Sequence, residues 1–389
     1  MVVQHNLQAM NSNRMLGVTT SSQAKVTEKL SSGYKINRAA DDAAGLSISE
    51  KMRKQIRGLD QASNNAQDGV SAVQTAEGAL AEVHDMLQRM NELAVQAANG
   101  TNSTSDRTAI QNEIDQLTTE IDRVAETTKF NETYLLKGGD STKTVTMKAH
   151  DAGLKGSLTV AADGKTATFK PAALETSDKV MIGGKEYKII DDAEADDQNN
   201  GLIKKATAES LMKAELVKAN SIGLDAPLAD DKVDGNLTNG FTITMGEQTV
   251  ANALSFNLHV GADADMTNKI NVNIDTMNSA FLGVKGLDVV GTDGIGTQAT
   301  YAIDAIADAI QKVSDQRSAL GAVQNRLEHT IKNLDNVVEN TTAAESQIRD
   351  TDMASTMVEY TKNNILQQAG QSMLAQANQS TQGVLSLLG

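Results

Sequence analysis

Residues 294–299 read GIGTQA and match the GxGxxA pattern of a dinucleotide-binding loop. They follow the apolar run Leu287–Val290 and open a helical pattern, which is the order that such a loop requires. The fingerprint also needs a short helix that leads to a second parallel strand with an acidic residue. Here the helical pattern continues for about 50 residues, and no strand follows it. We therefore interpret 294–299 as a flexible turn before a long helix and expect no cofactor.

No group of residues in the sequence predicts catalysis or a metal site. The histidines are too widely spaced to share a metal, and none belongs to an HExxH motif. Asp196–Gly201 is only faintly similar to a calcium loop, because Gln198 occupies a ligand position and Thr207 replaces the bidentate glutamate. We expect a protein that is not an enzyme and holds no metal. The histidines are His5, His84, His150, His259 and His329.

The composition narrows the classes of partner. A net charge of −15 disfavours nucleic acid, whose binding depends on basic patches. No apolar run reaches the roughly 18 residues of a membrane span, so we expect no membrane insertion, and the N-terminus lacks the pattern of a signal peptide. The chain has no cysteine, so disulfides and thiol chemistry are excluded.

Small and apolar residues at steps of three and four predict a helix over Leu59–Ala97, about 58 Å long. Gly69 is the one weak position in this seam. Gly100 is expected to cap the helix, and Ser105 or Asp106 to cap a second one. Because the connection is short, the two helices should form an antiparallel hairpin. A third pattern predicts a helix from about residue 300 to 348, too long to be stable without a partner, for which the hairpin is the simplest choice.

The middle of the chain has a different character. Between about residues 138 and 250, short β patterns alternate with glycine turns, and one helical pattern covers 207–219. A further β pair, 254–260 with 270–274, is expected closer to the helices. The predicted fold is therefore mainly α, with long antiparallel helices from both termini packed together and an inserted α+β or β-rich domain with β hairpins. The expected strands of the middle are 157–160, 166–170, 180–182, 186–190 and 241–245.

Both ends of the chain have very few charges. The last 27 residues and the first 13 contain no Asp, Glu, Lys or Arg. Helices of this type suit burial against other helices, where amides can still form hydrogen bonds but charges are costly to desolvate. A monomer has no obvious place to bury both ends, so we expect self-assembly. The expected assembly stripe is Ile365, Leu366, Ala369, Met373, Leu374 and Ala377.

Two long segments closely resemble bacterial flagellin. One is Arg14–Leu80, which includes LSSGYKINRAADDAAGLSISEKMR, and the other is Leu320–Gly389, which includes SQIRDTDMASTMVEYTKNNIL. The resemblance covers roughly residues 1–137 and 250–389, in the family's order. It implies a structural subunit that polymerises as a helical homopolymer into the flagellar filament, outside the cell.

The resemblance also implies a layered subunit. Residues 1–40 with 350–389 would form inner helices around the channel, 41–137 with 250–349 the long-helix layer, and 138–249 the outer domain. The segment Tyr34–Ser47 would link the two inner layers. Export through the flagellar type III route, a chaperone at the C-terminal segment, and hook-associated and cap proteins are further implied partners.

The family resemblance also implies a receptor-binding site. Many flagellins bind the innate receptor TLR5 through a motif that matches Gln88-Arg89-Met90-Asn91-Glu92-Leu93-Ala94-Val95 here, with Glu113 on the next helix. The hairpin geometry would bring Gln88, Arg89, Leu93 and Glu113 into one patch. The alternative is that Arg89 and Glu113 form an ordinary surface pair and that Leu93 widens the core.

Two alternative functions remain open at this level. A hook–filament junction protein shares the helical ends, but the long match at both termini favours the filament subunit. A flagellin whose middle domain acts as an adhesin is also compatible with residues 138–250, which lack any acid–base cluster for cleavage.

Overall fold

The structure is a computed structural model that describes residues 6–191, 195–224, 226–291 and 296–386, with side chains as far as 379. By contacts it divides into two compact units. The first comprises Met1–Asn64, Val260–Asn268 and Thr330–Gly389, and the second comprises Asn65–His259 and Lys269–His329. The helices α2 (Ala43–Ala97) and α6 (Thr297–Arg349) contribute residues to both units.

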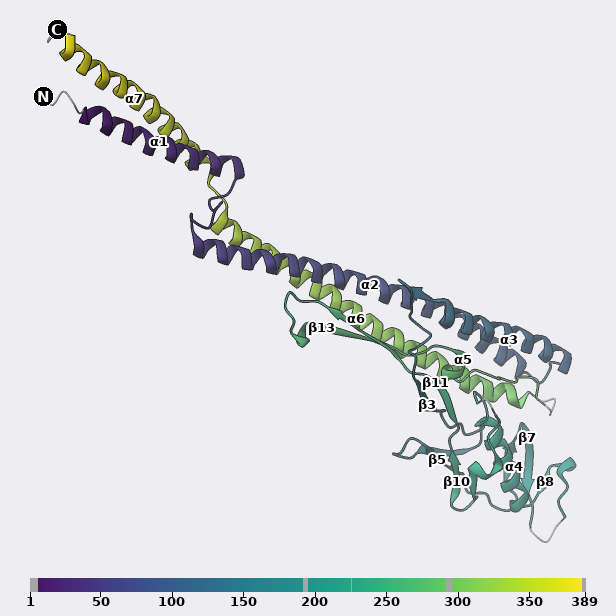
Figure 1. Cartoon of the computed structure of the whole chain (residues 1–389). Coiled ribbons are helices and arrows are strands. Elements are labelled where there is room, and N and C mark those ends of the chain that lie inside the picture. Colours follow the sequence, from purple (N-terminus) through teal and green to yellow (C-terminus); the bar gives the residue numbers. More distant parts are fainter. Residues whose placement is uncertain (1–5, 192–194, 225, 292–295, 387–389) are drawn as a thin grey trace. The chain divides into compact units, whose positions relative to one another are not determined.

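Helices dominate both ends of the chain, and the β-strands lie between them in sequence (Figure 1). The predicted fold class, mainly α with an inserted β-rich region, is confirmed. The predicted long helices are present as α2 and α6, although α2 begins at Ala43, well before the seam at Leu59. The other helices are α1 (Leu7–Ser32), α3 (Thr104–Thr127), α4 (Lys205–Ala219), α5 (Ser279–Leu282) and α7 (Met353–Ser386).

The predicted seam of α2 forms the core of the second unit. Every seam position from Ala66 to Ala97 is buried, against α3, α6 and the β pair that follows the middle domain. Gly69 is not a weak position, because a Cβ there would lie 2.2 Å from Cδ1 of Leu258. The missing side chain therefore makes room for a strand residue on the helix surface.

The α2–α3 hairpin is closed by residues other than those expected. Ser103 is the N-cap of α3, and its hydroxyl accepts from the backbone N–H of Asp106, whose carboxylate accepts from the N–H of Ser103 in return. At the end of α2, the buried Arg107 donates to the carbonyl oxygens of Ala97 at 2.9 Å and Asn99 at 3.3 Å. Arg107 thus satisfies helix-end carbonyls that we had assigned to a Gly100 cap.

The middle domain is a set of small sheets around one helix. A four-stranded antiparallel sheet has the order β4-β5-β10-β9, a three-stranded sheet has the order β6-β7-β8, and β11 pairs with β3. The five strands expected in the middle are present within a residue or two, as β4, β5, β6, β7 and β10, whereas β3, β8, β9 and β11 were not predicted. The strands are β3 (Thr142–Thr146), β4 (Gly156–Val160), β5 (Thr166–Pro171), β6 (Lys179–Ile182), β7 (Lys185–Ile189), β8 (Leu202–Ile203), β9 (Val233–Asn236), β10 (Gly240–Thr244) and β11 (Glu247–Ala251).

Two short antiparallel pairs complete the helical part. The pair β12 (Leu254–His259) and β13 (Lys269–Ile274) was predicted, and its register joins Leu254 to Ile274. The pair β1 (Lys129–Phe130) and β2 (Thr133–Tyr134) follows α3. Single 3-10 turns η1 (Gln198–Asn200), η2 (Asp230–Lys232) and η3 (Met266–Asn268) interrupt the connections.

Candidate assembly and receptor surfaces

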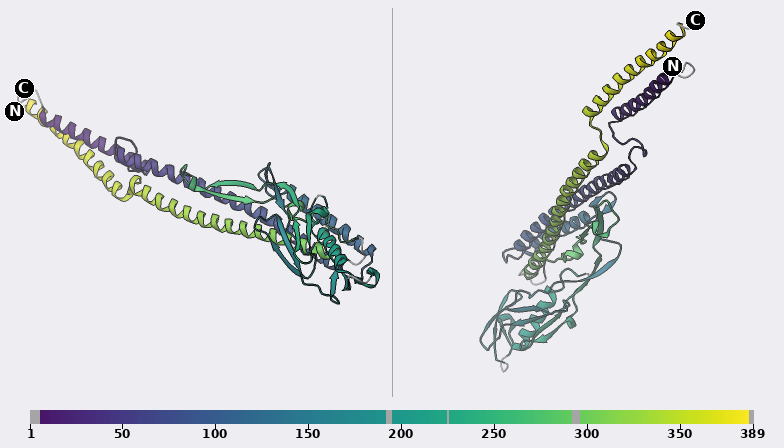
Figure 2. Two further views of the ribbon diagram at one scale, coloured as in Figure 1. Left: turned by 90° about the horizontal axis from the view of Figure 1, so that it is seen from below. Right: turned by 90° about the vertical axis from the view of Figure 1, so that its left-hand side faces the viewer.

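In the first unit, α1 and α7 lie side by side and antiparallel, so the start of α1 and the end of α7 lie at the same end of the pair (Figures 1 and 2). The amide of Asn6 caps α1 and donates to the carbonyl oxygen of Ala377 at 3.0 Å. Further along, Gly370 faces Leu16, and the Asn363 amide lies 3.4 Å from the hydroxyl of Ser22. The helices therefore meet through small and amide side chains.

The interior of this pair is very thin. Val26 is the only buried residue of α1, and in the part of α7 whose side chains are described only Thr356 and Ala377 are buried. Two helices with so little apolar burial gain little from their mutual contact, because helices in proteins are stabilised mainly by packing an apolar face. The pair therefore needs further contacts to be stable.

The predicted assembly stripe divides between two sides of α7. Leu374 and Ala377 lie on the side that is covered by α1. Ile365, Leu366, Ala369 and Met373 are exposed, with Ile365 61% and Met373 50% accessible. The apolar outer side of α7 thus has no partner within the described chain.

Helix α1 also exposes apolar side chains, next to charged ones such as Arg14 and Lys25. Four large apolar residues of α1 are exposed and are therefore not covered by α7. The sequence pattern alone did not show that these side chains are exposed in the subunit. They are Leu7, Met10, Met15 and Val18.

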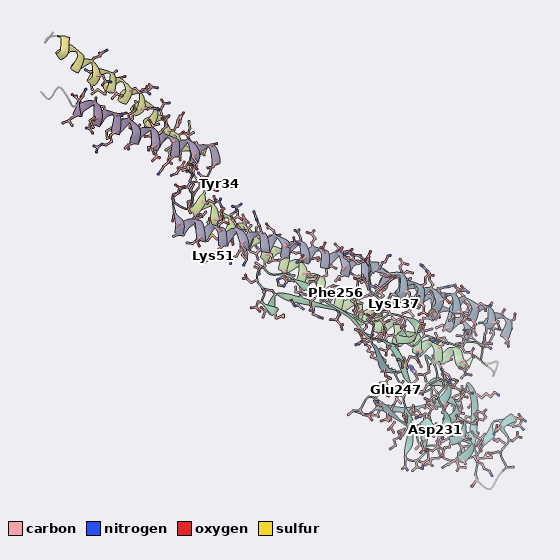
Figure 3. All side chains as sticks on the ribbon, viewed as in Figure 1. Tyr34, Lys51, Lys137, Asp231, Glu247 and Phe256 are labelled. Carbon is pink, nitrogen blue, oxygen red and sulfur yellow. The ribbon has the colours of Figure 1, made fainter. Side chains whose placement is uncertain are left out.

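The segment between α1 and α2 is joined to the α6–α7 turn. Tyr34 forms an antiparallel bridge with Asp350, and the N–H of Lys35 donates to the carbonyl oxygen of Arg349 at 2.6 Å. The Arg349 guanidinium lies over the Tyr34 ring, 4.6 Å from its centre, and Figure 3 labels Tyr34 in this segment. Hydrogen bonds from the backbone N–H groups of Arg38 and Asn37 lower the pKa of Asp41, so its carboxylate holds the turn.

The residues of the expected receptor site lie together on α2 and α3, in the second unit. Arg89 donates to Glu113 Oε1 from Nε at 3.0 Å and to Glu92 Oε2 at 3.1 Å, and the hydrogen bond that Glu113 accepts raises the pKa of Arg89. Gln88 is exposed and its amide lies 2.9 Å from the His84 ring. Leu93 is 2% exposed and belongs to the core.

The acidic segment that is faintly similar to a calcium loop forms hydrogen bonds within the fold. Asp196 accepts from the backbone of Lys204 and the hydroxyl of Thr207, and these bonds lower its pKa. Residues 294–299, which we interpreted as a turn and not as a dinucleotide-binding loop, lie partly outside the described residues. Within the described ranges, no three His, Cys, Asp or Glu side chains could hold a metal. The helices described here include none that is long and apolar enough to cross a membrane.

Long helices that expose apolar side chains, joined to a small mixed domain, are typical of a subunit that assembles with other copies. Residues 3–141 match the bacterial flagellin N-terminal helical region, and 303–388 match its C-terminal helical region. The flagellin of Clostridium tyrobutyricum is 44% identical, covering 98% of this chain and 100% of the relative. The flagellins of Halalkalibacterium halodurans and Bacillus subtilis are each 40% identical, with all of both chains covered. The chain belongs to the bacterial flagellin family, whose members are structural subunits of the extracellular flagellar filament.

Proposed function

We propose that this flagellin polymerises through the outer sides of α1 and α7. The observation that carries the proposal is the apolar row on α7, Ile365, Leu366, Ala369 and Met373, which is exposed on a helix pair that has almost no interior of its own. A second copy of the chain offers an equivalent apolar face. A heterologous contact of this kind, repeated from copy to copy, generates an open helical polymer.

The resemblance to flagellins implies a layered arrangement that fits this contact. Residues 1–40 with 350–389 would line the channel, 41–137 with 250–349 would form the layer around them, and 138–249 would face outward. A subunit that travels to the tip through the flagellar type III export route must keep its apolar face covered beforehand. An export chaperone on the C-terminal segment would do this, and hook-associated and cap proteins would contact the same helices at the filament's ends.

We further propose that Arg89, Glu113 and Gln88 form the exposed part of a TLR5-binding patch. Arg89 is held on the surface by two carboxylates, and such a fixed arginine is a frequent anchor in protein interfaces. Leu93 would act from below, by supporting the backbone and side chain of Arg89, because it is buried in the subunit.

The filament subunit is favoured over a hook–filament junction protein. The match to flagellins at 40% identity or more extends over the whole chain, including the middle domain. An adhesin role of residues 138–249 has no specific observation in its favour.

Deletion of Asn363–Gly389 tests the proposal. The shortened chain loses the whole apolar row on α7 and most of the helix that α1 contacts. We expect it to remain a soluble monomer under conditions in which the full chain forms filaments visible by negative-stain microscopy. Filaments of normal diameter from the shortened chain would refute the proposal.

A further inference from the structure

Methionine is the main side chain in this protein that a peroxide can oxidise. It has 15 methionines but no cysteine and no tryptophan. Without thiols, the thioether sulfur is the group most readily oxidised by peroxides. The positions of the methionines therefore decide where a peroxide acts first.

The methionines differ in exposure, and besides the two groups compared below, Met181 and Met266 are exposed elsewhere in the described chain. Those in the cores of the second unit are buried and shielded from a dissolved oxidant. Five others lie on α1 and α7, and each is at least 50% exposed, on sides not covered by the partner helix. The buried group is Met90, Met147, Met212, Met245 and Met277. The exposed group is Met10, Met15, Met353, Met357 and Met373.

We propose that these five exposed methionines, the terminal methionines, are oxidation sites through which peroxide blocks assembly of the free subunit. The inference rests on the proposed polymerisation through α1 and α7. In each step the sulfur takes one oxygen atom from hydrogen peroxide. The O–O bond breaks, an S=O bond forms, and the remaining oxygen leaves as water.

The sulfoxide changes the surface that assembly must bury. A flexible apolar side chain becomes a polar one, and its oxygen requires a hydrogen-bond donor once water is removed. Ile365, Leu366 and Ala369 have no side-chain donor, and the exposed donors beside Met373, Ser372 and Gln376, must lose their own water to reach the sulfoxide oxygen. Oxidation therefore weakens the contact without disturbing the core of the second unit, which holds the buried methionines.

The rate of oxidation should also differ between the free subunit and the filament, because peroxide reaches the terminal methionines more easily in the free subunit. In the free subunit the terminal methionines are open to solvent. In the polymer the same side chains lie in contacts between copies, so the filament should react more slowly than the monomer. Because methionine sulfoxide can be reduced enzymatically, the block is reversible.

The experiment treats full-length monomer briefly with dilute hydrogen peroxide, removes the oxidant, and maps sulfoxides by mass spectrometry. Assembly is then followed by sedimentation. We expect the terminal methionines to be oxidised before the buried ones and the critical concentration to rise at least about tenfold, equivalent to the loss of a single strong contact. Sulfoxide at these five positions should be enriched in the supernatant, and treatment with methionine sulfoxide reductases should restore assembly.

The matched variant carries M10L, M15L, M353L, M357L and M373L, which keeps the surface apolar without a sulfur. Its critical concentration after peroxide is compared with its own untreated value, and the two should be equal. M181L is the control, because Met181 is 52% exposed on β6 in the middle domain, and this variant should stay sensitive. Equal sulfoxide content at the terminal methionines in pellet and supernatant overturns the inference, even if the five-leucine variant fails to assemble. Failure of untreated wild-type protein to assemble would instead overturn the proposed function.

Discussion

The buried guanidinium of Arg107 donates through Nε to the carbonyl oxygen of Ala97, 2.9 Å away, across the turn between α2 and α3. A second nitrogen of the same group reaches the carbonyl oxygen of Asn99. One arginine from the first turn of α3 thus completes the end of a 55-residue helix.

Replacing Arg107 with Met should lower the free energy of unfolding by about 1–3 kcal/mol, because the buried carbonyl of Ala97, the last residue of α2, loses this donor. Urea unfolding followed by circular dichroism measures this loss. Arg123→Met is the control, since Arg123 forms an exposed ion pair with Glu120 and should leave the unfolding midpoint unchanged. An equal effect of the two substitutions would contradict the role assigned to Arg107.

Two glycines of α2 should respond in opposite directions to the same change. Gly69→Leu places carbon atoms where Leu258 now lies and should destabilise the protein by about 1–3 kcal/mol through overpacking. Gly78 has no atom within 4 Å of an added Cβ, so Gly78→Leu should stabilise the helix by about 0.5–1 kcal/mol. Thermal unfolding of the two variants measures both changes. Leu258→Ala should recover part of the stability lost in Gly69→Leu. If both glycine substitutions changed the stability in the same direction, Leu258 would not pack against Gly69 as described.

His150 should make stability depend on pH. Burial lowers the pKa of His150 despite the nearby carboxylates of Asp308, Asp304 and Asp151, while Lys148 opposes protonation. Because the folded pKa lies below the unfolded value of about 6.5, the unfolded chain takes up the proton more readily. The stability present above pH 6.5 should therefore decline as the pH falls through that value.

Unfolding measured from pH 7.5 to 5.5 checks this dependence. The variant His150→Gln should lose the decline in that window. Burial also raises the pKa of Asp304, but this carboxyl favours the folded state as the pH falls, which is the opposite sign. A decline in His150→Gln as steep as in the natural chain would assign the effect to other groups.

The receptor patch can be tested without disturbing the fold. Arg89→Ala should weaken binding to TLR5 by at least about tenfold, as expected for a central arginine of an interface. Surface plasmon resonance with the receptor ectodomain measures the change, and Arg123→Ala on the next helix serves as the control. Unaltered affinity would remove Arg89 from the receptor site.

The long helices and several β pairs were predictable because their patterns are local. The seam of α2 and the alternation of β12 and β13 each determine which face is buried. The strands β3 and β11 were missed, since TKTVT and EQTVA are short and mostly polar and pair across about a hundred residues of chain. The start of α2 was placed too late because its first residues bury few side chains.

For the candidate surfaces, too, the sequence could not predict which side chains the rest of the subunit covers. The sequence indicated that α7 has an apolar stripe, but it could not assign sides, because Leu374 and Ala377 face α1 while Ile365 and Met373 do not. That division depends on how Gly370 and Asn363 seat the partner helix, which is a tertiary property. The burial of Leu93 is likewise a packing result, and both alternatives for this residue were open from its sequence position.

The most direct test of assembly through the outer side of α7 is the critical concentration of Ile365→Gln/Met373→Gln, measured by sedimentation and compared with Met181→Gln. The pair of substitutions makes the exposed row polar while leaving Leu374, Ala377 and the contact with α1 unchanged. We expect the double variant to need at least about a hundredfold higher concentration to form filaments, given roughly 1.4 kcal/mol per tenfold for each lost contact, and Met181→Gln to assemble normally. Filaments from the double variant at the wild-type critical concentration would contradict the account.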